Sequence, residues 1–107
     1  MAKLKLNPEP TFKAKVGVPV PGGAPEPVEF TFQYRSKSEL AKWHDEVAEL
    51  PKDADEVALL RMFVAGWDLT DEFCDDNLRR LCDAYPGAAS AAMDVYLRES
   101  WGARRGN

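Results

Sequence analysis

The chain has 107 residues, of which 45% are hydrophobic and 30% charged, and its formal net charge is −4. This length predicts one domain with a modest core, and the acidic balance argues against a nucleic-acid-binding protein, which usually has a basic surface. No apolar run approaches the roughly 20 residues of a membrane-spanning helix, and the start, MAKLKLNPEP, lacks the apolar segment of a signal peptide. We therefore expect a single cytoplasmic domain over residues 1–107 with reduced thiols and no membrane partner.

The charges are unevenly distributed along the chain. Residues 1–35 contain five Lys or Arg and three Asp or Glu, whereas residues 36–107 contain nine and fifteen. The second part therefore offers an acidic surface that would suit a basic partner. The alternative is a solvated surface without a partner.

The first third of the chain predicts an irregular arm followed by a β-hairpin. Residues 1–10 contain Pro8 and Pro10 and show no periodicity. Residues 11–18 and 28–35 alternate apolar and polar side chains, which is typical of half-buried strands. Between them, PVPGGAPEP (19–27) has four prolines and two glycines, and predicts a long exposed loop. Residues 11–35 thus form a two-stranded antiparallel β-hairpin, whose apolar face must pack on another element.

Two helices are expected next. The stretch SKSE (36–39) is a capping box that starts the first helix, and Pro51 follows its last apolar position. Its apolar stripe is Leu40, Trp43, Val47 and Leu50. The second helix starts at DADE (53–56), with Asp53 as the capping residue, and Gly66 is its expected end. Its stripe is Val57, Leu60, Phe63 and Val64.

Two further helices complete the helical part, residues 36–101. The third should begin near Asp75 or Asp76, where acids favour the positive end of the helix dipole, and end at Pro86-Gly87. Its buried face is predicted as Leu78, Leu81, Cys82 and Tyr85. The last helix, about 87–101, is rich in alanine and allows close approach to a neighbour, and residues 102–107 read as a flexible tail. The predicted fold class is α+β, with the hairpin packed on a bundle of three to four helices.

No catalytic or cofactor site is expected. His44 stands beside Trp43 without a serine elbow elsewhere, and the glycines at 22–23 lack the context and the lysine of a phosphate loop. The acid pairs Asp71-Glu72 and Asp75-Asp76 are interpreted as partners of a helix dipole.

Metal sites and a disulfide are not expected either. A calcium loop starting at Asp68 would place Phe73 at the position that requires glycine and Arg79 at the position that requires glutamate. Cys74 and Cys82 are eight residues apart, roughly 12 Å along a helix, which is too far for a disulfide. Without a C-x-x-C unit they predict no zinc site, and we interpret both as small buried hydrophobic residues.

The stretch VAGWDLTDEFCDDN (64–77) is interpreted as a hinge between the second and third helices. Gly66 would end one helix, while Trp67 and Leu69 would insert apolar side chains into the gap. Phe73 would pack against the next helix from the position before its cap. Core packing of Trp67 and a partly exposed anchor for a partner both remain open.

Several stretches resemble the small tail assembly chaperones of long-tailed bacteriophages. They are the opening KLKLNPEPTFKAKVGVPVPGGAPEPVEFTFQYRSKSEL (3–40), GWDL (66–69), DAYPGAA (83–89) and ARRGN (103–107). The resemblance covers nearly the whole chain. It implies a non-enzymatic protein of the host cytoplasm that coats the helical tape-measure protein, recruits tail-tube subunits and is absent from the finished virion.

The resemblance also implies two further partners. Coating a long client favours self-association into rings or open arrays. Such genes often encode a longer frameshifted form, and Arg105-Gly106-Asn107 permits, without requiring, a slippery codon sequence. The rival hypothesis from another class is a small acidic regulatory or antitoxin-like binding module.

The candidate partner-contact residues come from the hinge and the last helix. They are Trp67, Leu69, Phe73, Ala88, Ala92, Tyr96 and Trp101. Each has core packing as its alternative. The proline-rich loop 19–27 is a second candidate contact, because such a loop is preordered, and a plain connector is its alternative.

Overall fold

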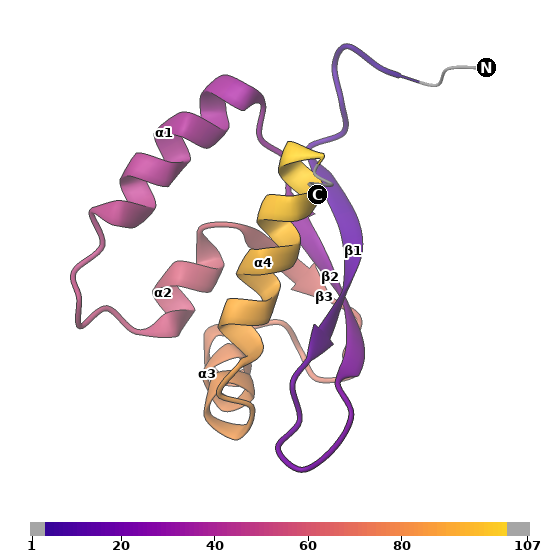
Figure 1. The fold of residues 1–107 in the computed structure, drawn as a ribbon, viewed down its shortest axis with the longest axis vertical. Coiled ribbons are helices and arrows are strands. Elements are labelled where there is room, and N and C mark those ends of the chain that lie inside the picture. Colours follow the sequence, from indigo (N-terminus) through magenta and orange to yellow (C-terminus); the bar gives the residue numbers. More distant parts are fainter. Residues whose placement is uncertain (1–3, 103–107) are drawn as a thin grey trace.

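The computed structural model describes residues 4–102, which form a three-stranded antiparallel sheet and four helices (Figure 1). The strands are β1 (Thr11–Val18), β2 (Glu26–Gln33) and β3 (Val64–Trp67), in the order β1-β2-β3. The helices are α1 (Lys37–Ala48), α2 (Glu56–Arg61), α3 (Asp75–Ala84) and α4 (Ala88–Trp101). The predicted α+β class is confirmed. The predicted tail lies, except for Gly102, outside the described residues, as do the first three residues of the predicted arm.

The predicted hairpin is present, and β1 pairs with β2 from Thr11 opposite Gln33 to Val18 opposite Glu26. Strand β2 begins earlier than the sequence predicts, because Glu26 and Pro27 belong to the ladder and not to the loop. Strand β3 pairs only with the other end of β2, so one side of β2 is open at Pro27. A residue without an N–H group is tolerated at such an open edge.

The third strand replaces the end of the predicted second helix. The prediction that this helix continues to Val64 and ends at Gly66 is wrong, since α2 ends at Arg61 and both residues lie in β3. The N–H of Gln33 donates to the carbonyl of Phe63 at 2.9 Å, and Val64 pairs with Phe32. The open edge of β2 therefore satisfies the backbone groups that a longer helix would have satisfied internally.

The helix caps agree with the sequence at α1 and differ at α2. In the capping box, the N–H of Glu39 donates to Oγ of Ser36 at 3.3 Å, and the N–H of Ser36 donates to Oε1 of Glu39 at 2.8 Å. This second bond stabilises the carboxylate and lowers the pKa of Glu39. At α2 the prediction of Asp53 is wrong, because Asp55 caps the helix by accepting from the N–H of Ala58.

Helix α4 lies across one face of the sheet, next to β1 (Figure 1). Ala88, Ala89 and Ala92 are at most 3% exposed, so the small side chains of α4 allow it to lie close to the rest of the chain. Tyr96 is fully buried at the centre of an aromatic cluster. Its ring lies between 5.1 and 6.1 Å from the rings of Phe12, Phe32, Trp43 and Phe63.

Candidate functional site

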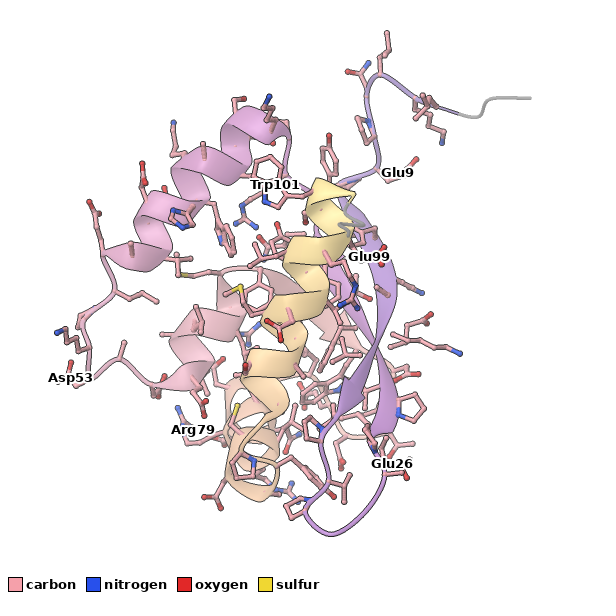
Figure 2. All side chains as sticks on the ribbon, in the orientation of Figure 1. Glu9, Glu26, Asp53, Arg79, Glu99 and Trp101 are labelled. Carbon is pink, nitrogen blue, oxygen red and sulfur yellow. The ribbon has the colours of Figure 1, made fainter. Side chains whose placement is uncertain are left out.

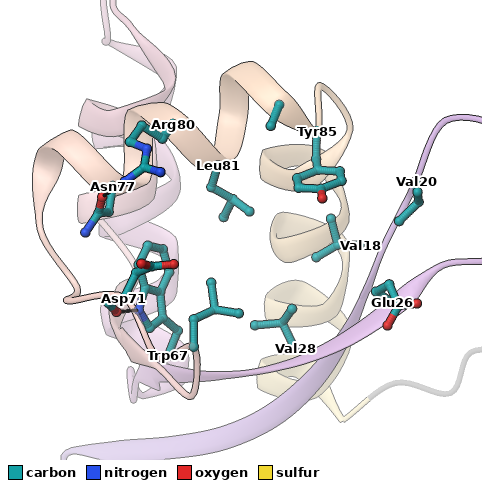
Figure 3. Close-up of a pocket in the computed structure, with 12 residues that line it drawn as sticks. Val18, Val20, Glu26, Val28, Trp67, Asp71, Asn77, Arg80, Leu81 and Tyr85 are labelled. Atoms are coloured by element: carbon teal, nitrogen blue, oxygen red, sulfur yellow. Dashed lines mark hydrogen bonds between the residues drawn. The ribbon is translucent and has the colours of Figure 1, made fainter.

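An apolar recess lies between the loop end of the β1–β2 hairpin and helix α3 (Figure 3). Its volume is about 370 Å³, and we call it the hairpin groove. Its principal apolar lining residues are Val18, Val20, Val28, Trp67, Leu69, Leu81 and Tyr85. Its polar residues are Glu26, Asp71, Asn77 and Arg80.

The segment that follows β3 forms one wall of the groove and is fixed by hydrogen bonds to the sheet. The N–H of Asp68 donates to the carbonyl of Glu29 at 3.0 Å. In return, the N–H of Glu29 donates to Oδ1 of Asp68 at 3.1 Å. This pair of bonds holds the start of the segment on β2, so Leu69 reaches the groove from a defined position.

Trp67 is half-buried at the same wall. Its Nε1–H donates to the carbonyl of Asp71 at 2.8 Å, which closes a turn over residues 67–71. Phe73 packs edge-on against its indole at 5.1 Å. The guanidinium of Arg61 lies 4.8 Å from the ring of Phe73 and also binds Oδ1 of Asp75 at 2.7 Å. These contacts hold the indole of Trp67 in its position at the groove wall.

The rim of the groove carries more acidic than basic groups. Glu26 and Asp71 lie on opposite sides of the recess (Figure 3). Arg80 is the basic residue of the lining, and its Nη1 donates to Oδ1 of Asn77 at 2.9 Å. The groove thus combines an apolar interior with an acidic rim, which suits an apolar segment that also carries a positive charge.

The structure brings together only some of the predicted contact residues. Trp67 and Leu69 line the groove, Phe73 supports Trp67 from behind, and Val20 comes from the predicted contact loop. By contrast, Trp101 is 53% exposed at the far end of α4 (Figure 2).

The other three predicted contact residues, all on α4, face the interior of the domain. Ala88, Ala92 and Tyr96 are at most 1% exposed. In this conformation they contact the protein's own core, because α4 uses its small side chains to pack within the chain. They offer no surface to another molecule here.

Tyr85 is a groove residue that the sequence analysis placed on the buried face of the third helix. That prediction is wrong, because α3 ends at Ala84 and Tyr85 leaves the helical conformation with φ −129° and ψ 86°. Its side chain is 37% exposed and lines the groove. Pro86 indicates in the sequence that the helix ends before Tyr85, since the residue before a proline is disfavoured in a helix.

The histidine and the two cysteines of the chain do not line the hairpin groove. His44 is exposed, with Nδ1 3.9 Å from Oδ1 of Asp45. Cys74 and Cys82 are both free. In this part of the chain no group of three or more His, Cys, Asp or Glu is placed to hold a metal ion. What the hairpin groove can do is bind apolar side chains.

None of the helices that the structure describes has the length and apolar character needed to cross a membrane.

Comparison with curated proteins found no match, and comparison with solved structures found none either. A family model described as phage tail assembly chaperone matches residues 1–107, the entire sequence. The family match therefore spans the arm, the hairpin, the groove and all four helices, and the chain belongs to the phage tail assembly chaperone family.

Proposed function

We propose that this tail assembly chaperone acts without catalysis, by binding apolar segments of the tape-measure protein in the host cytoplasm. It keeps that client soluble, recruits tail-tube subunits to it and leaves before the virion is complete. The observation that carries the proposal is the family match over the whole chain. A longer frameshifted form would join the same assembly. Arg105, Gly106 and Asn107, which permit the slippery codon sequence, lie outside the described residues.

The hairpin groove supports this proposal as the place where a client is held. A helical client commonly inserts a few apolar side chains into a groove on its partner. At about 370 Å³, the groove is near the lower end of the ~300–1,000 Å³ range of ligand pockets, which suits short apolar anchors. Trp67 supplies a rigid aromatic wall of the kind that dominates binding energy at interfaces.

The test is co-expression of the tape-measure protein with and without this chain, followed by measurement of the soluble client. We expect soluble client only when the chain is present. Val20→Arg places a long charged side chain at the groove and should reduce the recovered complex about tenfold or more, the loss expected for one apolar anchor. Ala41→Arg, at an exposed position of α1, is the matched control and should bind as the wild type does.

Two results would contradict the proposal. One is a tape-measure protein that stays insoluble in the presence of the folded wild-type chain. The other is equal client recovery with Val20→Arg and Ala41→Arg, which would move the contact away from the groove. A tight equimolar complex with a small basic protein, and no effect on the client, would favour the regulatory binding module. Pull-down of the tail-tube protein with the client complex tests recruitment separately.

A further inference from the structure

We propose that a polar recess at the start of α1 binds a carboxylate of a second protein partner, the tail-tube subunit that the chaperone recruits to its client. Naming the tail-tube subunit as this partner rests on the proposed function. The recess has a volume of about 500 Å³, and we call it the α1 recess. Six of its lining residues come from the end of β2, the segment that follows it, and α1: Gln33, Tyr34, Arg35, Ser38, Lys42 and Trp43.

The guanidinium of Arg35 is held in place in the α1 recess by uncharged groups. Its Nη1 donates to the hydroxyl of Tyr96 at 3.1 Å, and its Nη2 donates to Oε1 of Gln33 at 3.2 Å. It also lies 5.4 Å from the ring centre of Trp43. Because none of these partners is an acid, the half-buried guanidinium keeps its full positive charge. A guanidinium has five N–H donors, so it can still donate to a carboxylate of another molecule.

Ser38 and Lys42 place further donors at the same recess. They are four positions apart on α1, so they lie on one face of the helix. Within residues 4–102, neither Lys42 nor Arg35 forms an ion pair with an acid of the chain. The recess therefore presents two positive charges and a hydroxyl group, which together suit a carboxylate.

Two acids, Glu39 and Glu46, also line the α1 recess, but neither bonds to its cations. Oε1 of Glu39 accepts from the N–H of Ser36 in the capping box. The bonds with Ser36 are the main cause of the lowered pKa of Glu39, and the charges of Arg35 and Lys42 contribute less. A carboxylate from a partner therefore meets both cations without first breaking an ion pair.

The α1 recess has the residue types of a protein contact and is separate from the hairpin groove. Tyrosine, tryptophan and arginine dominate binding energy at interfaces, and Tyr34 is 39% exposed. Glu26, at the start of β2, lines the groove, whereas Gln33, at the end of β2, lines the recess. Seven residues of extended strand separate them by roughly 24 Å, and α1 begins at the end of the hairpin opposite to its loop (Figure 1). Client and tail-tube subunit can therefore bind one chain at the same time.

The experiment measures the affinity of the full chain for purified monomeric tail-tube protein by isothermal titration calorimetry. Arg35→Gln removes the positive charge and retains a hydrogen-bond donor, and should weaken binding about tenfold or more, the loss expected for a hydrogen bond to a charged group. Lys42→Glu reverses the charge at an exposed position and should weaken binding similarly. Lys13→Glu makes the same change at an exposed position of β1, outside both sites, and should bind as the wild type does.

Salt provides a readout that a purely structural role of Arg35 would not move. Added salt screens an ionic contact, so the affinity of the wild type should fall as salt is raised, and that of Lys42→Glu should fall less. Circular dichroism checks that the variants are folded.

Four results would overturn the inference. One is wild-type affinity in Lys42→Glu. Another is a loss confined to Arg35→Gln with unchanged salt dependence, which would make Arg35 a structural residue only. An equal loss in Lys13→Glu would assign the effect to overall charge, and a wild-type chain that fails to bind the tail-tube protein would leave the recess without this partner.

The client test separates this inference from the proposed function. If Lys42→Glu solubilises the tape-measure protein but no longer retains the tail-tube protein, both stand. If Lys42→Glu solubilises the client and retains the tail-tube protein as the wild type does, only the inference fails. If the wild-type chain binds the tail-tube protein through Arg35 and Lys42 but leaves the tape-measure protein insoluble, the inference stands and client binding fails.

Discussion

The side chain of Tyr96, on α4, contacts several other elements through both its ring and its hydroxyl group. Its ring packs in the aromatic cluster, while its hydroxyl donates to the carbonyl of Gln33 at 2.9 Å and accepts from Nη1 of Arg35 at 3.1 Å. The guanidinium of Arg35 also lies 5.4 Å from the ring of Trp43. One tyrosine thus joins α4 to the end of β2 and to the segment before α1.

Tyr96→Phe should lower the free energy of unfolding by about 1–2 kcal/mol, because the carbonyl of Gln33 and the guanidinium of Arg35 both lose a partner. The ring and its packing are kept. Urea unfolding followed by circular dichroism measures the change, with Tyr34→Phe at a 39% exposed tyrosine as the control. Equal stability of the two variants would show that the buried hydroxyl contributes nothing.

Cys82 predicts a specific dependence of stability on alkaline pH. Burial, with the carboxylate of Glu56 nearby, raises the pKa of its thiol from the ordinary 9.0 to about 11. The unfolded thiol therefore ionises first, and the folded state holds the extra proton between about pH 9 and pH 11. Stability from this group is complete below pH 9 and is lost as the pH rises toward 11.

Between pH 8.5 and pH 10.5, the unfolding free energy of the wild type should fall by up to about 2 kcal/mol more than that of Cys82→Ala. The other ionisable groups are common to both proteins, so their contribution cancels in this difference. Parallel pH profiles for the two proteins would contradict the assignment.

Iodoacetamide at pH 8 should also modify the half-buried Cys74 before Cys82.

Between elements, Gly87 at the start of α4 lies close to the connection between β1 and β2. A Cβ atom at Gly87 would lie 3.0 Å from Cγ of Pro19. At Gly66 in β3, by contrast, a Cβ atom would meet Cβ of Thr31 at 3.7 Å, an ordinary contact. The two glycines therefore differ in what a methyl group would displace.

Gly87→Ala should lower the unfolding free energy by about 1–2 kcal/mol, because the added methyl group pushes the proline ring outward. Gly66→Ala is the matched control, and we expect a change within about 0.5 kcal/mol. Chemical denaturation of both variants measures the difference. A neutral Gly87→Ala would mean that the connection at Pro19 shifts without loss of packing.

The elements that the sequence predicts well are those with their own local signal. Alternating side chains predict β1 and β2, and the capping box predicts the start of α1 at Ser36. Strand β3 has no such signal, because it is four residues long and its apolar residues also continue the helical stripe of α2. Only the open edge of β2, which lies about thirty positions earlier, decides that Val64 joins a strand, and local pattern does not contain that information.

Across the whole molecule, the candidate site could be predicted only in part, because local sequence pattern does not contain the contacts between distant elements. Trp67 and Leu69 could be selected from the sequence because they stand between predicted elements next to acids. Ala88, Ala92 and Tyr96 carry the same apolar signal, and only the packing of α4 shows that this face is used inside the chain. Tyr85 and Val20 line the same groove because the hairpin approaches α3, which no spacing in the sequence reveals.

Helix α1 has a consequence for how the domain opens. It contributes two buried side chains over twelve residues, Leu40 and Trp43, whereas α4 contributes five. The indole of Trp43 makes one hydrogen bond, from Nε1–H to the carbonyl of Met62 at 3.0 Å. Withdrawing Leu40 and Trp43 would release the helix while leaving every strand pairing in place. We therefore expect α1 to be the least costly unit for subglobal unfolding, with amide exchange faster there than in the sheet.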